Sequence, residues 1–577
     1  MINHRLEAGK DELRAVRRES RGLFWAVALF SLMVNLLMLT GPLYMLQVYD
    51  RVLGSRSFET LIGLTLIVAF LYGMMGLLDF SRARIMARVG SRFQARLDRR
   101  VFDAVIRKSA VAPDETSTTG LRDLESIQRL LISPALMSLF DMPWTPFFLA
   151  GIMLFHPWLG YLAIGGGLFL IALAVLNQTT TRLPIAKANM AVVQSEKISG
   201  QLVNEAEMVQ AMGMREAGFR RWEAARNDSL SQSLAASDAG GMYGTLTKTF
   251  RLFLQSAMLG LGAYLVLQGE LSPGAMIAGS ILMGRALAPI EQAIGQWPMF
   301  QRAKKGWDSL AMLLGSVPVE PARTALPAPQ AKLEVQQLTV VPPGQNQATL
   351  RMVNCVVQPG QALGVIGTSG AGKSTLARAI TGLWRPAGGK IRLDGAALDQ
   401  YDPSVLGQLI GYLPQRVELF DGTIAENIAR LDPNPDAEKI VAAARKADAH
   451  DMILKMPDGY DTRVSASGGR LSGGQIQRIG LARAMYSDPV ILVLDEPNSN
   501  LDNEGSMALN TAIRAMKEAG KSVLIMAHRP AAIQECDLLL MLEGGNVRAF
   551  GPKDEVLKKM VQNHQTIARD GNPGGMR

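Results

Sequence analysis

The residues with the clearest chemical purpose form a glycine-rich loop between an apolar run, ALGVI, and a helix-forming run, TLARAI. The loop consists of Gly367, Thr368, Ser369, Gly370, Ala371, Gly372, Lys373 and Ser374, in the pattern GxxxxGKS. Its glycines let backbone N–H groups surround phosphates, and the helix N-terminus adds positive potential. We expect Lys373 to reach the β- and γ-phosphates, Ser374 to bind Mg²⁺ and Thr375 to be a lesser candidate. The flanking elements argue against an ordinary glycine-rich turn.

Two carboxylates follow the all-apolar run Val490–Leu494. A buried strand delivers such residues at its C-terminal tip, where α/β sheets bind nucleotides. We expect Asp495 to hold Mg²⁺ through water and Glu496 to polarise the attacking water as general base.

The elements that must position these residues differ between the two halves of the chain. The second half alternates short β-rich runs with helices, as in an α/β nucleotide-binding domain. The first half has six apolar runs long enough to cross a hydrocarbon core of about 30 Å. They span residues 23–48, 60–79, about 135–155, about 158–178, about 249–268 and 274–296. A soluble protein is not expected to bury six such runs as helices in its core.

The composition excludes several classes of protein. The 577 residues are 48% hydrophobic and 19% charged, which excludes a disordered or collagen-like chain. Two cysteines exclude a disulfide framework, and five scattered histidines form no zinc-type cluster. The net charge of +9 does not by itself indicate a nucleic-acid partner, and six spans exclude a soluble DNA-associated ATPase.

The distribution of arginine and lysine orients the spans. The tail before residue 23 and the long segments 81–130 and 179–247 are rich in basic residues, whereas the alternate loops are short. The positive-inside rule then places both termini and both long loops in the cytoplasm. The long loops are helix-forming and should extend the spans as rods. We interpret their basic runs as a solvated face with contacts to membrane lipids.

Two charged residues, Asp141 and Arg285, lie inside apolar runs. Charges at such depth are costly and usually face protein or water. They could line a translocation path. Alternatively, they could form a structural ion pair in the bundle or reach the membrane surface along their side chains.

Between the glycine-rich loop and Asp495 lies LSGGQ, residues 471–475, and here the sequence resembles the ATP-binding cassette (ABC) family. GYLPQ ends in Gln415, SNLD spans Ser499 to Asp502, and MAHRP contains His528. The resemblance implies an ATP hydrolase in which Gln415 senses Mg²⁺ and the attacking water.

The same resemblance implies that His528 contacts the γ-phosphate and that Asp502 belongs to the nucleotide site. It also implies that Ser472 and Gly474 bind the γ-phosphate of ATP held by another subunit. One cassette and six spans per chain then imply a homodimer.

Two positions depart from the family pattern. Members of the family usually have an aromatic residue that stacks on adenine. At the corresponding position this chain has Val341 or Pro342, so we expect apolar packing against adenine instead. Exporters also tend to have a glutamate a few residues before LSGGQ. Here Ala466 lies near that place, so we expect a weaker contact at this point with the membrane helices of the partner subunit.

The segments 41–61, 140–160 and 279–297 resemble type I protein secretion ATPases of Gram-negative bacteria. They are most similar to exporters of alkaline proteases, lipases and surface-layer proteins, and cassette segments 412–430 and 494–502 agree. The resemblance implies ATP-driven export of an unfolded protein with a C-terminal signal across the bacterial inner membrane. It also implies a periplasmic adaptor (membrane fusion) protein and an outer-membrane channel as partners.

Alternative functions are a lipid- or drug-exporting half-transporter and a regulator that does not pump. Glu496 argues against the regulator, which would lack the catalytic carboxylate. Some relatives carry an N-terminal cysteine peptidase, but no Cys precedes residue 355, so cargo processing by that route is not expected.

The expected organisation is a six-helix transmembrane domain, all-α and ABC type I exporter-like, followed by an α/β P-loop domain. The expected boundaries are a cytoplasmic tail at 1–22, the membrane domain at 23–316, a proline-rich linker at 317–332, the nucleotide-binding domain at 333–565 and a disordered tail at 566–577.

Overall fold

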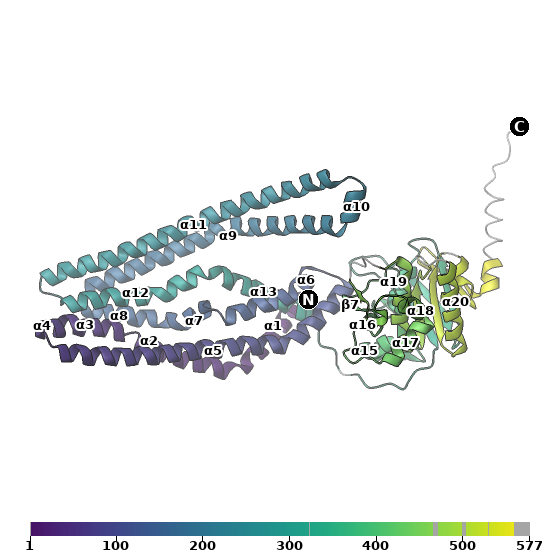
Figure 1. Ribbon diagram of the computed structural model, residues 1–577, viewed down its shortest axis with the longest axis horizontal. Coiled ribbons are helices and arrows are strands. Elements are labelled where there is room, and N and C mark those ends of the chain that lie inside the picture. The colour runs from purple at the N-terminus through teal and green to yellow at the C-terminus, as the bar shows by residue number, and fades with distance from the viewer. Residues whose placement is uncertain (1, 322, 466–470, 499–502, 529, 559–577) are drawn as a thin grey trace. The chain divides into compact units, whose positions relative to one another are not determined.

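The computed structural model describes residues 2–321, 323–465, 471–498, 503–528 and 530–558. The expected tail at 566–577 lies outside these residues. The chain divides into two compact units (Figure 1). The helical unit comprises residues 1–107 and 114–318, and the α/β unit comprises residues 108–113 and 319–577.

The helical unit contains the six helices that the hydropathy of the sequence predicts to span a membrane. Its elements are α1 (Ile2–Glu19), α2 (Arg21–Leu37), α3 (Thr40–Gln47), the π-helix η1 (Val48–Val52), α4 (Leu53–Ser55), α5 (Phe58–Val111), α6 (Glu115–Leu131), α7 (Pro134–Asp141), the 3₁₀ turn η2 (Met142–Trp144), α8 (Thr145–Phe155), α9 (Pro157–Asn204), α10 (Ala206–Ala211), α11 (Arg215–Leu267), α12 (Pro273–Gly295) and α13 (Trp297–Ser316).

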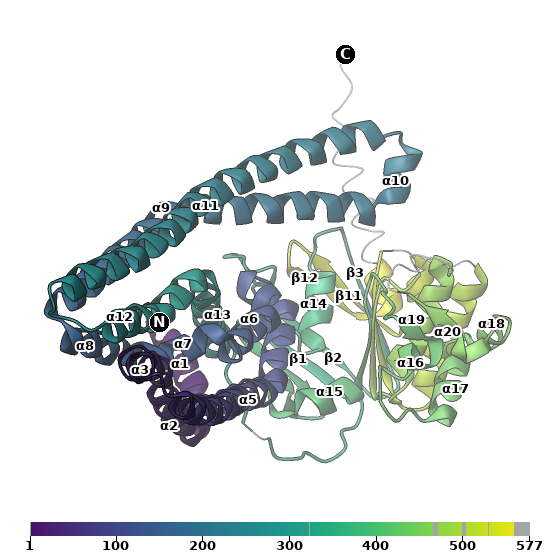
Figure 2. The same ribbon diagram turned by 60° about the vertical axis from the view of Figure 1, so that its left-hand side comes forward.

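Three of these helices are far longer than a bilayer requires. Helices α5, α9 and α11 have 54, 48 and 53 residues, which at about 1.5 Å per residue is more than twice the hydrocarbon thickness. They therefore confirm that the basic segments continue the spans as rods. Helices α9 and α11 run side by side and are joined at one end by α10 (Figure 2). Gly166 permits their close approach, since a Cβ there would lie 2.3 Å from Leu254 Cδ2.

A buried ion pair joins three helices inside the helical unit. Arg82 Nη1 of α5 donates to Asp141 Oδ1 at the end of α7 over 2.6 Å. Asn35 Nδ2 of α2 donates to the same oxygen over 2.8 Å. For Asp141 the structural ion pair expected as one alternative is therefore present, with Arg82 as the partner. Grouping Arg82 with the solvated basic residues was wrong, because its side chain is only 6% exposed.

Helix α1 packs along α13 through reciprocal glycines. A Cβ on Gly9 would lie 1.9 Å from the carbonyl oxygen of Ala311, and one on Gly315 would lie 1.8 Å from that of Arg5. Arg100 of α5 reinforces the contact by donating to Glu12 and to the carbonyl oxygen of Val317.

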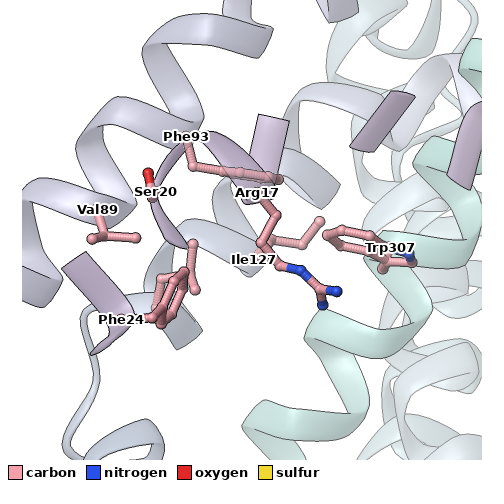
Figure 3. A pocket seen from close by; sticks show the side chains of 8 residues that line it. Arg17, Ser20, Phe24, Val89, Phe93, Ile127 and Trp307 are labelled. Atoms are coloured by element: carbon pink, nitrogen blue, oxygen red, sulfur yellow. The ribbon is translucent and has the colours of Figure 1, made fainter. Parts of the chain in front are cut away.

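A small cavity of about 30 Å³ lies where α1 and α2 meet α5, α6 and α13. The Arg17 guanidinium lies 5.7 Å from the centre of the Trp307 ring, and apolar side chains such as Phe24 and Phe93 form most of the remaining wall (Figure 3).

The α/β unit contains a six-stranded sheet of order β12-β11-β3-β10-β9-β6, a four-stranded antiparallel sheet of order β2-β1-β4-β5 and the two-stranded pair β7-β8. The strands are β1 (Leu333–Val340), β2 (Leu350–Val357), β3 (Ala362–Gly367), β4 (Gly388–Leu393), β5 (Ala396–Ala397), β6 (Ile410–Leu413), β7 (Gly422–Thr423), β8 (Arg463–Val464), β9 (Ile491–Asp495), β10 (Ser522–Ala527), β11 (Leu538–Glu543) and β12 (Asn546–Pro552).

The helices of this unit are α14 (Lys373–Ile380), α15 (Pro403–Leu409), α16 (Ile424–Ile428), α17 (Ala437–Lys446), α18 (His450–Leu454), α19 (Gly473–Met485) and α20 (Asn503–Glu518), with 3₁₀ turns η3 (Leu398–Gln400), η4 (Gly459–Asp461) and η5 (Pro530–Ile533). Strands β9 and β10 are buried along their whole length. Such continuous apolar runs are typical of parallel strands covered on both faces.

Candidate nucleotide site

The candidate catalytic side chains gather at the carboxyl ends of parallel strands. Strand β10 pairs in parallel with both β3 and β9, and β9 pairs in parallel with β6. Gln415 follows β6, Glu496 follows β9, His528 follows β10, and the glycine-rich loop follows β3. One edge of the sheet therefore collects residues that lie far apart in the sequence, as is usual for nucleotide sites of α/β sheets.

The glycine-rich loop leads directly into α14. Gly372 caps this helix with φ at 101°, a left-handed conformation that favours glycine. A Cβ at this position would also lie 2.6 Å from Leu350 Cδ2. Lys373 Nζ donates to the carbonyl oxygens of Gly367 over 2.8 Å and Thr368 over 3.1 Å. The loop thus holds the ammonium group against its own backbone.

Ser374 and Asp495 form the oxygen-rich part of the site. Ser374 Oγ donates to Asp495 Oδ1 over 3.2 Å. Burial raises the pKa of Asp495 above its usual range, and the hydrogen bond from Ser374 opposes this only in part. A hydroxyl and a carboxylate are ligands of the kind Mg²⁺ prefers, and the side-chain oxygen of Gln415 is a third of the same kind. These residues fit Mg²⁺.

Glu496 is held by its neighbours on both oxygens. Gln415 Nε2 donates to Oε2 over 2.9 Å, and His528 Nδ1 lies 3.1 Å from Oε1. The backbone of Glu496 is left-handed, with φ at 53°, and its N–H donates to the carbonyl oxygen of Met526 on β10. A non-glycine residue in this conformation is strained by roughly 1–3 kcal/mol, a cost often found at functional sites.

The LSGGQ segment begins α19. Ser472 Oγ accepts from Gln475 N over 3.3 Å, while Gln475 Oε1 accepts from Ser472 N over 2.8 Å. This reciprocal cap fixes the first turn and leaves Ser472 exposed, with Gly474 half-buried. The exposed start of α19 suits an anion.

The cleft at the strand ends has a volume of about 990 Å³. Lys373, Gln415, Glu496 and His528 line it together with Gly367, Thr368 and Ser369. Thr375, by contrast, is 8% exposed and lies in the first turn of α14. Asp502, Ser499 and Ala466 lie outside the described residues.

One positioning residue escaped the sequence analysis. Gln477 of α19 is 2% exposed, and its Nε2 donates to the carbonyl oxygen of Pro497 over 3.1 Å. It therefore ties the LSGGQ helix to the residue after Glu496. The available signal was a glutamine on the buried face of α19, whose other buried residues are apolar or glycine.

The two positions expected to take the place of the adenine-stacking residue lie in the connection between β1 and β2. Thr349 N donates to the carbonyl oxygen of Val340 and closes this hairpin, and neighbouring Leu350 packs against Gly372. The connection contains half-buried Val341 and buried Pro342. That apolar packing at these positions replaces aromatic stacking on adenine stays a prediction.

Comparison with protein families matches both units. Residues 24–288 match the family described as ABC transporter transmembrane region, and residues 350–499 match the family described as ABC transporter. The type I secretion system ATP-binding protein PrsD of Rhizobium meliloti (strain 1021) is 44% identical over 556 residues, which cover 96% of this chain and 95% of PrsD.

A more distant relative is the toxin RTX-I translocation ATP-binding protein of Actinobacillus pleuropneumoniae, 28% identical over 93% of this chain and 76% of the relative. A solved bacterial Atm1-family ABC exporter with ATP bound has a TM-score of 0.78, with 21% identity over 96% of this chain and 99% of that one. It confirms the expected exporter fold.

Proposed function

Because this chain belongs to the ABC transporter family, we propose that two copies form the inner-membrane exporter of a type I secretion system. The exporter couples ATP hydrolysis to the passage of an unfolded protein with a C-terminal signal. The observation that carries the proposal is the 44% identity with PrsD across 96% of the chain, since it includes both the membrane helices and the cassette.

In the proposed hydrolysis, Glu496 takes a proton of the water that attacks the γ-phosphate. The bond from the γ-phosphorus to the bridging oxygen breaks, and ADP leaves with that oxygen. Before the nucleotide enters, the Glu496 carboxylate accepts a hydrogen bond from Gln415 and lies beside His528, so both neighbours hold it in place at the site. Lys373 balances the charge of the β- and γ-phosphates, and His528 contacts the γ-phosphate. Ser374, Asp495 and Gln415 would hold Mg²⁺, which supplies charge neutralisation on the phosphate oxygens.

The proposed working unit is a dimer, because the exposed start of α19 lies outside the set of residues that line the cleft. Ser472 and Gly474 of one copy would bind the γ-phosphate held by the loop 367–374 of the other. Asp502 would complete this composite site. ATP then joins two cassettes, and hydrolysis releases them.

The proposed setting is the bacterial inner membrane, with both termini and both basic segments in the cytoplasm. The basic segments would contact membrane lipids there. A periplasmic adaptor protein and an outer-membrane channel would continue the path, and no nucleic acid takes part. The proposed domain limits are 1–22 for the cytoplasmic tail, whose helix α1 packs on α13 of the helical unit, 23–316 for the membrane domain, 317–332 for the linker and 333–565 for the nucleotide-binding domain.

Comparison of secreted proteins tests this function. Strains would carry the natural gene, a deletion, or the deletion complemented with the natural gene or with Glu496→Gln. We expect a secreted polypeptide to disappear in the deletion and Glu496→Gln strains and to return with the natural gene. An unchanged set of secreted proteins, with ATPase activity stimulated by lipids or hydrophobic drugs but not by the C-terminal peptide of a secreted protein, would favour a lipid or drug exporter.

A further inference from the structure

The charges within the apolar spans are almost fully matched by partners. These spans contain Asp79, Asp141, Arg251, Arg285 and Glu291. Arg82 forms ion pairs of 2.6 Å with both aspartates, and Arg251 lies 3.4 Å from Glu291. Among the described residues, Arg285 has no carboxylate within ion-pair distance. One unmatched positive charge therefore remains in the membrane-spanning part of the chain.

This charge occupies an uncovered strip on the most enclosed of the six spans. Helix α12 contacts α3, α7, α8, α9 and α11. Apart from Pro273 at its start, its exposed residues are Gly284, Arg285, Gln292 and Gly295. Arg285 and Gln292 are seven residues apart and thus on the same side of the helix. The uncovered strip of α12 is therefore polar or glycine.

The other five spans have a different outer surface. Each exposes large apolar side chains, for example Leu29, Phe70, Leu154, Leu168 and Phe253. Within Pro273–Gly295, which is described throughout, no large apolar side chain is exposed. Lipid tails match the surface of the other spans, whereas a strip of arginine, glutamine and glycine does not face lipid favourably.

Arg285 lies so deep in the span that its guanidinium group could reach the membrane surface only at a high cost in free energy. It lies twelve residues after Pro273, or about 18 Å along the helix, and six residues, or about 9 Å, from Glu291 toward the other end. The carboxylate of Glu291 is engaged by Arg251. A charge at this depth needs water or an anionic partner.

We propose that the strip Gly284–Arg285–Gln292–Gly295, here called the α12 strip, lines the polypeptide path. Arg285 binds carboxylates of the passing chain, so the exporter favours acidic segments. The glycines leave room for an extended backbone, and Gln292 offers hydrogen bonds without charge. This inference rests on the proposed export function and adds the charge class of its substrate.

The first experiment tests whether Arg285 faces water. The full-length protein in lipid nanodiscs carries Arg285→Cys or, as matched control, Phe70→Cys, and reacts with a charged, membrane-impermeant methanethiosulfonate. The unsubstituted protein is the blank, since Cys355 and Cys536 are buried. We expect Arg285→Cys to react at least about tenfold faster than Phe70→Cys, because the reagent enters water but not hydrocarbon. If Arg285→Cys and Phe70→Cys react equally slowly, position 285 does not face water and the proposal is wrong. This holds whether lipid or the second copy covers the position.

The second experiment tests charge preference through stimulation of ATPase activity by unfolded peptides of equal length that are rich in Glu, Gln or Lys. We expect half-maximal stimulation at about fivefold lower concentration for the Glu-rich peptide than for the Gln-rich one. Arg285→Gln should remove this preference, Arg285→Lys should keep most of it, and Arg285→Glu should favour the Lys-rich peptide. Arg226→Gln, an exposed position on α11, is the charge-matched control.

The outcomes separate the two proposals. If all three peptides stimulate the protein equally and Arg285→Gln changes nothing, the role of Arg285 is wrong while export of polypeptides stands. If no peptide of any composition stimulates the protein or crosses the membrane, the export function itself is wrong.

Discussion

Gln415 Nε2 donates a hydrogen bond of 2.9 Å to Glu496 Oε2, which joins the residues that follow β6 to the end of β9. In the proposed cycle Gln415 would help to hold Mg²⁺, and His528 would contact the γ-phosphate. When the nucleotide enters, Gln415 and His528 therefore give up their contacts with the Glu496 carboxylate and form contacts with the nucleotide site. The general base is thereby released when water and phosphate are both present.

Replacement of Glu496 by Gln should separate binding from hydrolysis. The amide keeps the size of the side chain and one acceptor oxygen but cannot take a proton, so we expect ATPase activity to fall about 10²- to 10⁴-fold. ATP binding should persist and trap a dimer visible by size-exclusion chromatography. Glu518→Gln, at the exposed end of α20, is the control. Hydrolysis by Glu496→Gln at the parental rate would remove its assignment as general base.

Replacement of Lys373 by Ala should act on binding instead. The ammonium lies in the loop within 3.1 Å of the Gly367 and Thr368 carbonyl oxygens, ready to pass to phosphate. Loss of charge-assisted bonds worth roughly 1.5–3 kcal/mol should raise the Kd for ATP at least about tenfold by equilibrium dialysis. Lys390→Ala, exposed on β4, should bind ATP normally. An unchanged Kd in Lys373→Ala would contradict the phosphate contact.

Replacement of Arg82 by Ala should destabilise the helical unit. It leaves the Asp141 carboxylate, only 11% exposed, without its cation. Breaking a buried pair from one side typically costs about 3–5 kcal/mol. We expect a clearly lower Tm in detergent, recovered largely by the double replacement Arg82→Met and Asp141→Leu. Arg88→Ala, exposed on α5, should shift Tm little. Equal Tm for Arg82→Ala and Arg88→Ala would show that the pair contributes nothing.

Both native cysteines should resist thiol reagents until the cassette unfolds. Burial raises the pKa of Cys355 and of Cys536 from an ordinary value of 9.0 to about 12. Keeping these thiols neutral favours the folded state fully below pH 9, and this contribution is lost as the pH rises from 9 toward 12.

At pH 8 we therefore expect no reaction with Ellman's reagent in native protein and two thiols per chain in denaturant. Stability to urea should fall from pH 9 to pH 10.5, and less so in Cys355→Ala. Rapid labelling of native protein at pH 8 would show that the thiols are accessible.

The sequence predicted most of the site because loop, strand and helix order fix where these residues converge. Glycine spacing located the phosphate loop, and an apolar run ending in two acids located Asp495 and Glu496. The family pattern alone supplied Gln415 and His528, whose partners are remote in sequence.

The internal contacts of the helical unit were less predictable. Arg82 lies at the edge of an arginine-rich segment, and only packing of α5 against α7 shows that it differs from its neighbours. Gln477 was missed for a similar reason, because its partner is a backbone carbonyl oxygen twenty residues away. Pairings between distant elements depend on tertiary structure, which hydropathy and spacing do not encode.

The close seating of Gly9 on Ala311 and of Gly315 on Arg5 has a practical consequence for cloning. Hydropathy alone would suggest starting an expressed fragment at the first charge-free run. Such a fragment would lack α1, which packs on α13. Leu310 and Leu314 would then be exposed, and Arg100 would lose its ion pair with Glu12. The first eighteen or so helical residues are thus as much a part of the folded bundle as the spans themselves, and a truncated gene should yield poorly folded product.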